Sequence, residues 1–258
     1  MRSRPPRVFL LPCIFGDEPS LAEFRAALAG RVAFDLLDYP DIDRPSSEIR
    51  NFDSIIRQTV QRVRSLQPSG EVHIVGYSFG GLVGFSAACR LQAEGRRVGL
   101  LTLLDSRALS LKVPNSVRLT RNRDAAPGAW GVAADVASRS LIAVGLSEVV
   151  RAAIGPAGRI FGPEATNGLR RLFLQNLRGR ALRGLSLGRF DGPLLLFRAR
   201  EQPFPDMPSD LGWSAHCAAV RSATLNGDHN SMFRAEHLTA NAERVWSEMA
   251  AQVFKPEG

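Results

Sequence analysis

The chain has 258 residues, 45% of them hydrophobic and 22% charged, so it can bury a sizeable core and is not a disordered segment. No stretch approaches the roughly 18 apolar residues that span a bilayer, and the short apolar run after the basic N-terminus lacks the cleavage site of a secretory signal. The three Cys are odd in number and widely spaced, which argues against a disulfide framework or a zinc cluster and fits a reducing, cytoplasmic location. Since the sequence begins with Met1, we expect a free-standing protein rather than an excised domain.

Apolar strands and amphipathic helices alternate along the first hundred residues. Strands are predicted at 7–12, 32–37, 72–76 and 98–104, and helices at 21–28, 46–66 and 80–94. The strand pattern resumes at 193–197 and 219–225, and a helix over 235–254 ends the chain. Strands that are apolar throughout, with helices between them, indicate an α/β fold whose mostly parallel sheet has helices on both faces.

No strand is predicted between residues 107 and 190, where helices are expected at 136–153 and 167–177. We therefore predict one domain over 1–258, with a helical lid inserted at 107–190. The insertion holds 14 Lys and Arg against 4 Asp and Glu, a net charge of +10, whereas the remainder holds 19 against 21. The insertion thus carries all of the excess positive charge.

The strongest motif is Gly76–Gly80, which reads G-x-S-x-G and is followed by Gly81. It lies between an apolar strand and an apolar helix. A serine on such a sharp strand-to-helix turn lies in strained backbone, and the flanking positions must be glycine because a Cβ there would clash. Ser78 is therefore the candidate nucleophile, and we expect its side chain to face solvent.

An acyl-transfer site also needs donors for the oxyanion that forms on the substrate carbonyl. The backbone N–H of Phe79 directly follows the serine and lies at a helix N-terminus, which favours negative charge. The second donor is expected in the loop after the first strand, at the N–H of Cys13 or Ile14.

His229 is the candidate base because it follows the last predicted strand, and the chain order Ser then His matches that of α/β hydrolases. Asp105 ends the strand that neighbours the serine strand, so its carboxylate can reach the same edge of the sheet and orient the imidazole. In many hydrolases of this class the acid instead follows the next strand. Glu201 and Asp206 occupy that alternative place here.

The set of motifs resembles the thioesterase domain that ends nonribosomal peptide and polyketide assembly lines. The matching segments are Leu10–Pro12, Gly76–Gly81, Leu103–Ser106, Leu194–Ala199, Gly212–Trp213 and Gly227–Phe233. The resemblance implies an α/β-hydrolase fold with a helical lid and a triad of Ser78, Asp105 and His229. Two parts depart from the family pattern: the loop after the first strand has larger residues where the family has small ones, and 107–170 aligns with nothing in the family.

The resemblance also implies the substrate, an acyl, peptidyl or polyketide chain on the phosphopantetheine arm of a carrier protein. Release would proceed by hydrolysis or cyclisation through an acyl-serine intermediate, without a metal or other cofactor. Carrier proteins are acidic, so the basic insertion is a candidate docking face, with Arg170, Arg171, Arg178 and Arg180 as its expected contacts. A plain solvated Arg-rich surface is the alternative explanation of this charge.

Other partners and functions are less well supported. Few aromatic residues in the insertion argue against nucleic acid, and no stable membrane insertion is expected. The oligomeric state is not predicted. Two functions remain as alternatives, a general carboxylesterase or lipase acting on free esters and a non-catalytic binding protein that keeps the fold.

Overall fold

The computed structural model describes residues 5–111, 129–203 and 206–253, which form two compact units. The core unit takes the described chain up to Asp38, then Ile56–Leu111, and then everything from Ser186 onward. The helical unit takes Tyr39–Ile55 and the described part of 112–185. Among the described residues, no helix is long and apolar enough to cross a membrane.

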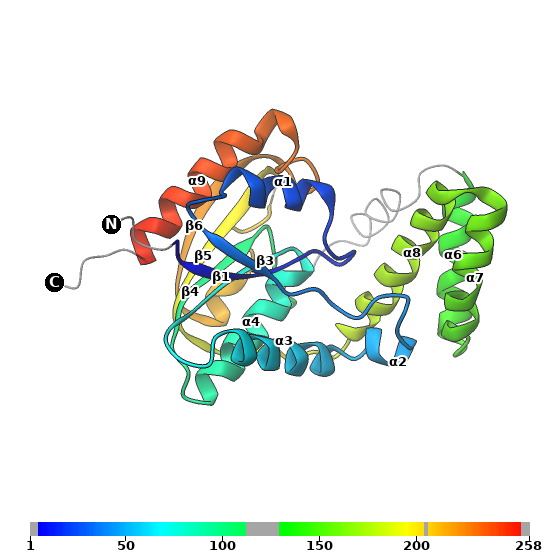
Figure 1. Ribbon diagram of the computed structural model, residues 1–258, viewed down its shortest axis with the longest axis horizontal. Coiled ribbons are helices and arrows are strands. Elements are labelled where there is room, and N and C mark those ends of the chain that lie inside the picture. Colours follow the sequence, from blue (N-terminus) through cyan, green and yellow to red (C-terminus); the bar gives the residue numbers. More distant parts are fainter. Residues whose placement is uncertain (1–4, 112–128, 204–205, 254–258) are drawn as a thin grey trace. The chain divides into compact units, whose positions relative to one another are not determined.

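The core unit is built on a six-stranded sheet in the order β2-β1-β3-β4-β5-β6 (Figure 1). Its strands are β1 (Arg7–Leu11), β2 (Ala33–Leu36), β3 (Val72–Tyr77), β4 (Val98–Leu104), β5 (Phe190–Glu201) and β6 (Cys217–Asp228). All neighbouring strands are parallel. The apolar runs of β3 and β4 are almost wholly buried, as strands covered on both faces must be. The predicted α/β class with a parallel sheet is confirmed.

Helices cover both faces of this sheet. Helices α1 (Pro19–Ala27) and α9 (Ala235–Val253) lie on one face, and α4 (Phe79–Ala93) and most of α3 (Phe52–Leu66) lie on the other (Figure 1). On the first face, α1 and α9 bury apolar side chains against those of the strands in one continuous core cluster. A short 3-10 helix, η1 (Trp213–Ala215), precedes β6.

The predicted helix over 46–66 is in fact two helices, α2 (Ser46–Ile49) and α3. The break falls at Asn51, whose side-chain oxygen accepts a hydrogen bond from the N–H of Ser54 at 2.9 Å. Asparagine in this role satisfies one of the N–H groups left unpaired in the first turn of a helix, so it favours a new helix start over continuation.

The helical unit contains α2, α6 (Ala129–Ala143), α7 (Ser147–Phe161) and α8 (Pro163–Ala181). The helix predicted over 136–153 is broken after α6, because Gly145 adopts a left-handed backbone with φ of 88° that ends a helix. The unit has its own apolar core, formed by Ile49, Ile142, Ile154, Phe173, Leu174 and Leu177.

Arginines of α8 stabilise the helical unit internally. Arg170 forms an ion pair with Asp41, and Arg178 donates to the carbonyl oxygen of Pro40 at 2.7 Å. The guanidinium carbon of Arg178 also lies 5.1 Å from the centre of the Tyr39 ring, and the residue is 0% exposed. The expectation that Arg178 belongs to an exposed docking face is therefore wrong, because the side chain is committed to packing within the unit.

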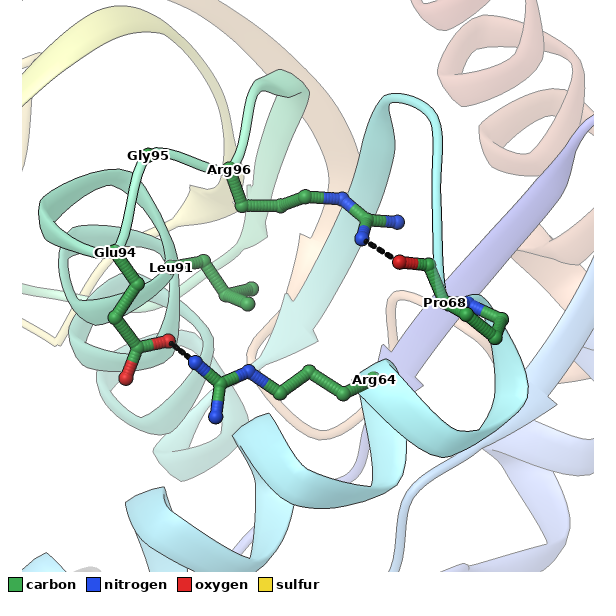
Figure 2. Close-up of a pocket in the computed structure, with 6 residues that line it drawn as sticks. All are labelled: Arg64, Pro68, Leu91, Glu94, Gly95 and Arg96. Atoms are coloured by element: carbon green, nitrogen blue, oxygen red, sulfur yellow. Dashed lines mark hydrogen bonds and ion pairs between the residues drawn. The ribbon is translucent and has the colours of Figure 1, made fainter.

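Arg96 fastens the chain where α3 ends and β4 begins, on the edge of the sheet where the strands start. Its guanidinium donates to three carbonyl oxygens, those of Gln67 (2.7 Å), Pro68 (2.5 Å) and Gly70 (2.7 Å). The neighbouring hollow of about 360 Å³ is bordered by a second arginine, Arg64, which is paired with Glu94 (Figure 2). The charged groups of Arg64 and Arg96 at this hollow are engaged with other elements of the fold, so we assign the hollow no binding role.

Arg96→Ala should lower the free energy of unfolding by about 1–3 kcal/mol, because carbonyl oxygens at the end of α3 lose a charged donor. Arg97→Ala is the matched control. The Arg97 side chain is 82% exposed and forms an ion pair with Glu71, so its loss should cost less than about 0.5 kcal/mol. Urea unfolding of the two variants measures the difference, and equal stability would contradict this role of Arg96.

Candidate active site

Three predicted site residues follow three different strands at the carboxyl edge of the sheet. Ser78 follows β3, Asp105 follows β4 and His229 follows β6. Nδ1 of His229 lies 2.7 Å from Oδ2 of Asp105, and Nε2 of His229 lies 2.9 Å from Oγ of Ser78. The structure therefore joins the three side chains in one hydrogen-bonded chain. The alternative acids Glu201 and Asp206 are both exposed.

The serine turn is strained and tightly packed. Ser78 has φ of 57° and ψ of −116°, and it is 6% exposed, so its side chain is buried rather than facing solvent as expected. A Cβ on Gly76 would lie 2.4 Å from the carbonyl oxygen of Gly80. A Cβ on Gly80 would lie 2.2 Å from the carbonyl oxygen of Leu11. Both contacts are with backbone atoms, which is why the motif requires glycine at these positions.

Gly81, the glycine that follows the motif, makes room for the loop that carries Asp105. A Cβ at this position would lie 2.3 Å from Cβ of Ser106, the residue after Asp105. The loop after β4 therefore packs directly against the first turn of α4. Asp105 itself has φ of 43°, in the left-handed region that aspartate tolerates better than most side chains.

Gly80→Ala should lower the free energy of unfolding by about 1–3 kcal/mol, because the new methyl group meets backbone oxygens that cannot give way. Gly179→Ala is the matched control. It lies inside α8 with nothing within 4 Å of the added Cβ, so it should stabilise the chain by about 0.5–1 kcal/mol. Thermal melting of both variants tests this, and a Gly80→Ala protein as stable as the parent would contradict the packing argument.

Asp105 is enclosed by hydrogen-bond donors. Its side chain is 8% exposed, and Oδ1 accepts from the N–H of Ala199 at 2.8 Å and from Nε2 of Gln202 at 3.2 Å. Burial by itself would raise the pKa of Asp105, but the interactions with His229, Ala199 and Gln202 outweigh it and hold the pKa below its ordinary value. The carboxylate is therefore ionised at neutral pH and can stabilise a positive imidazolium.

Tyr77, the variable residue before the serine, holds the base from one side. Its ring stacks on the imidazole of His229 with centroids 5.3 Å apart, and its hydroxyl donates to the carbonyl oxygen of His229 at 2.5 Å. Sequence reasoning missed this role. The indication available in the sequence was that Tyr77 directly precedes Ser78 in the G-x-S-x-G motif.

Asn241 of α9 fixes the two ends of the loop that carries His229. Sequence reasoning did not predict this role either. It is 2% exposed. Its amide accepts from the N–H of Asn226 at 2.9 Å and donates to the carbonyl oxygens of Asn226 (3.0 Å) and Met232 (2.7 Å). Asn226 precedes His229 and Met232 follows it, so one buried side chain ties the two ends of the loop together. A polar residue on the buried stripe of an amphipathic helix was the only signal for it.

The two segments expected to supply the oxyanion donors, the first turn of α4 and the loop after β1, meet beside the serine turn. Phe79 is the first residue of α4, so its N–H belongs to the helix N-terminus. The loop after β1 reaches the same turn, since a Cβ on Gly80 would also lie 2.4 Å from the carbonyl oxygen of Pro12. Cys13 follows directly, and its thiol lies 3.6 Å from both the carbonyl oxygen of Gly16 and a carboxylate oxygen of Glu18. The thiol thus takes part in the structure of this loop.

A serine, a histidine and an aspartate at the ends of parallel strands, with the serine on a glycine-flanked turn, define a serine hydrolase with the α/β-hydrolase fold. A profile of the thioesterase domain family matches residues 6–249. The chain belongs to the thioesterase domain family.

Curated relatives are much longer proteins that match over short stretches. The chain is 33% identical to N-(5-amino-5-carboxypentanoyl)-L-cysteinyl-D-valine synthase of Penicillium rubens over 61 residues. This matched stretch is 24% of the present chain and 2% of that protein. It is 29% identical to a non-reducing polyketide synthase of Pseudevernia furfuracea over 104 residues. That stretch is 40% of the present chain and 5% of the synthase. The chain therefore spans only a small fraction of the length of these relatives.

Solved thioesterase structures match nearly the whole chain. The NocB thioesterase domain, in covalent complex with a fluorophosphonate nocardicin G analog, has a TM-score of 0.69 at 19% identity and covers 95% of this chain and 94% of that one. The RedJ thioesterase of the prodiginine pathway in Streptomyces coelicolor has a TM-score of 0.63 at 19% identity, with 97% and 87% covered. These similarities establish the shared fold.

Proposed function

We propose that the protein is a serine thioesterase that releases an acyl, peptidyl or polyketide chain from the phosphopantetheine thioester of a carrier protein. The observation that carries the proposal is the hydrogen-bonded chain from Asp105 through His229 to Ser78, with distances of 2.7 and 2.9 Å. Membership of the thioesterase domain family supports the thioester as the scissile bond. The relatives, which are named as a synthase of N-(5-amino-5-carboxypentanoyl)-L-cysteinyl-D-valine and a polyketide synthase, support a carrier-bound chain.

In the first half of the reaction, Oγ of Ser78 attacks the thioester carbonyl while Nε2 of His229 accepts the hydroxyl proton. Asp105 stabilises the resulting imidazolium and keeps its ring oriented. When the tetrahedral intermediate collapses, the C–S bond breaks and the imidazolium returns the proton to the sulfur. The carrier leaves as a free thiol, and the chain remains as an ester of Ser78.

In the second half, His229 removes a proton from the incoming nucleophile, which attacks the acyl-serine ester and restores the Ser78 hydroxyl. Water gives a free acid, whereas a hydroxyl or amine within the chain gives a ring. The N–H groups of Phe79 and of Cys13 or Ile14 are proposed to hold the oxyanion in both halves. The mechanism requires no metal or other cofactor.

Ser78→Ala should abolish acyl-enzyme formation, because no oxygen remains to carry the chain. Mass spectrometry after incubation with an acyl N-acetylcysteamine thioester should show one acyl adduct on the parent protein and none on the variant. An adduct that persists in the variant would overturn the assignment of Ser78. A parent protein that turns over simple oxygen esters with higher kcat/KM than carrier-bound thioesters would favour the carboxylesterase alternative.

The helical unit is the proposed docking face for an acidic carrier protein. Of the arginines first expected there, Arg178 is buried, Arg170 is paired with Asp41 and Arg180 donates to the carbonyl oxygen of Ile142 at 3.3 Å. Arg171 is half-buried, so we turn to more exposed arginines.

Arg159 on α7 and Arg183 after α8 are both exposed, unlike Arg178. Guanidinium groups suit the carboxylates of an acidic protein and the phosphate of its arm. Attraction of this kind acts mainly on the association rate and is screened by salt.

The double substitution Arg159→Glu and Arg183→Glu should lower kcat/KM for an acyl-carrier substrate by roughly tenfold or more at low salt. Turnover of the N-acetylcysteamine thioester should not change. Arg62→Glu on α3, an exposed arginine of the core unit, is the matched control and should leave both substrates unaffected. If the two substrates have the same salt dependence, the docking proposal is wrong while the serine chemistry stands.

A further inference from the structure

Gln202 contacts the acid from the place in the sequence where the alternative acids were expected. It follows β5 directly and is half-buried. Its Nε2 lies 3.2 Å from Oδ1 of Asp105 and 2.7 Å from the carbonyl oxygen of Ala199. Both neighbours are acceptors only. The amide nitrogen, which has two hydrogens, must therefore face them, and each hydrogen has one acceptor.

The donors around Asp105 are divided unequally between its two oxygens. Oδ1 accepts from the N–H of Ala199 and from Gln202, whereas Oδ2 lies 2.7 Å from Nδ1 of His229. Two donors on Oδ1 fix the rotation of the carboxylate and so aim Oδ2 at the imidazole. Because the side chain is only 8% exposed, water has little access to replace a lost donor.

We propose that Gln202 is a positioning residue for Asp105, whose neutral amide holds the acid in the orientation that serves His229. The inference rests on the proposed function, since it assigns a role in the same reaction. The hydrogen bonds of its amide go to Asp105 and Ala199, so Gln202 is proposed to act through Asp105.

The chemistry of the site explains why an amide, rather than a carboxyl group, suits position 202. A glutamate there would bring a second carboxylate about 3 Å from Asp105, where it would repel the acid when ionised and could donate only one hydrogen when protonated. A second negative charge near the imidazole would also favour its protonated form, which cannot act as a base. The neighbouring Glu201 is exposed, so a charge change at that position is a control for a charge change at position 202.

The rate of Ser78 labelling by a fluorophosphonate tests the proposal without any carrier or thioester. In Gln202→Leu, labelling should slow by roughly ten- to hundredfold, the effect of one hydrogen bond to a charged group. In Gln202→Glu, the acid limb of the pH–rate profile should move to higher pH by about one unit. Glu201→Gln, a charge change of the same size at the next residue, should alter neither the rate nor the profile.

The outcomes separate the inference from the proposed function. Gln202 variants that lose thermal stability but keep the parent's labelling rate and pH profile would show a purely structural role and overturn the inference. A parent protein that is labelled at Ser78 yet turns over no thioester would remove the proposed function, while the Gln202 comparison would still hold. A parent protein that is not labelled at all would remove both.

Discussion

The close approach of the first turn of α4 to its neighbours is the constraint on which the site depends. Gly80 lets the backbone of the loop after β1 come within contact distance, and Gly81 lets Ser106, in the loop after β4, do the same. The nucleophile, the loop expected to donate to the oxyanion and the loop that bears the acid are therefore brought together at a single point. The left-handed backbone of Ser78 is held in place by this packing, which is how a strained conformation persists in a folded protein.

The acid and the base are held by different means. Asp105 is fixed by donors from the end of β5, which favour its charged form in a place where burial opposes it. Asn241 binds the backbone on both sides of His229, at Asn226 and Met232, and the imidazole stacks on the Tyr77 ring. Hydrogen bonds and a ring contact from neighbouring groups thus position both His229, which moves the protons, and Asp105, which orients it, and this is the kind of support a preorganised site requires.

Much of this arrangement could be predicted from the sequence, because strand ends and a glycine-flanked serine are local patterns. The fold class and the meeting of Ser78, Asp105 and His229 follow from parallel strands sharing one carboxyl edge. The supporting residues could not be predicted in this way. Gln202 and Asn241 are uncharged. The helical spacing of Asn241 indicates that it is buried, but neither residue's role can be read from the sequence, because it depends on how Asp105 and the His229 loop are placed by the fold. Arg178 was misjudged because arginine is normally exposed, and its burial depends on a ring and a carbonyl group that lie far away in the chain.

The helical unit is assembled from two separate stretches of chain, and this bears on how such units can be exchanged between relatives. Its core includes Ile49, and Asp41, Pro40 and Tyr39 receive the arginines of α8. A recombination event that transferred only the helices α6 to α8 into a relative would leave those arginines facing foreign partners and the apolar core without Ile49. Successful exchange therefore requires the stretch from Tyr39 to Ile55 to travel with the helices, so two pairs of crossover points rather than one define the transferable module.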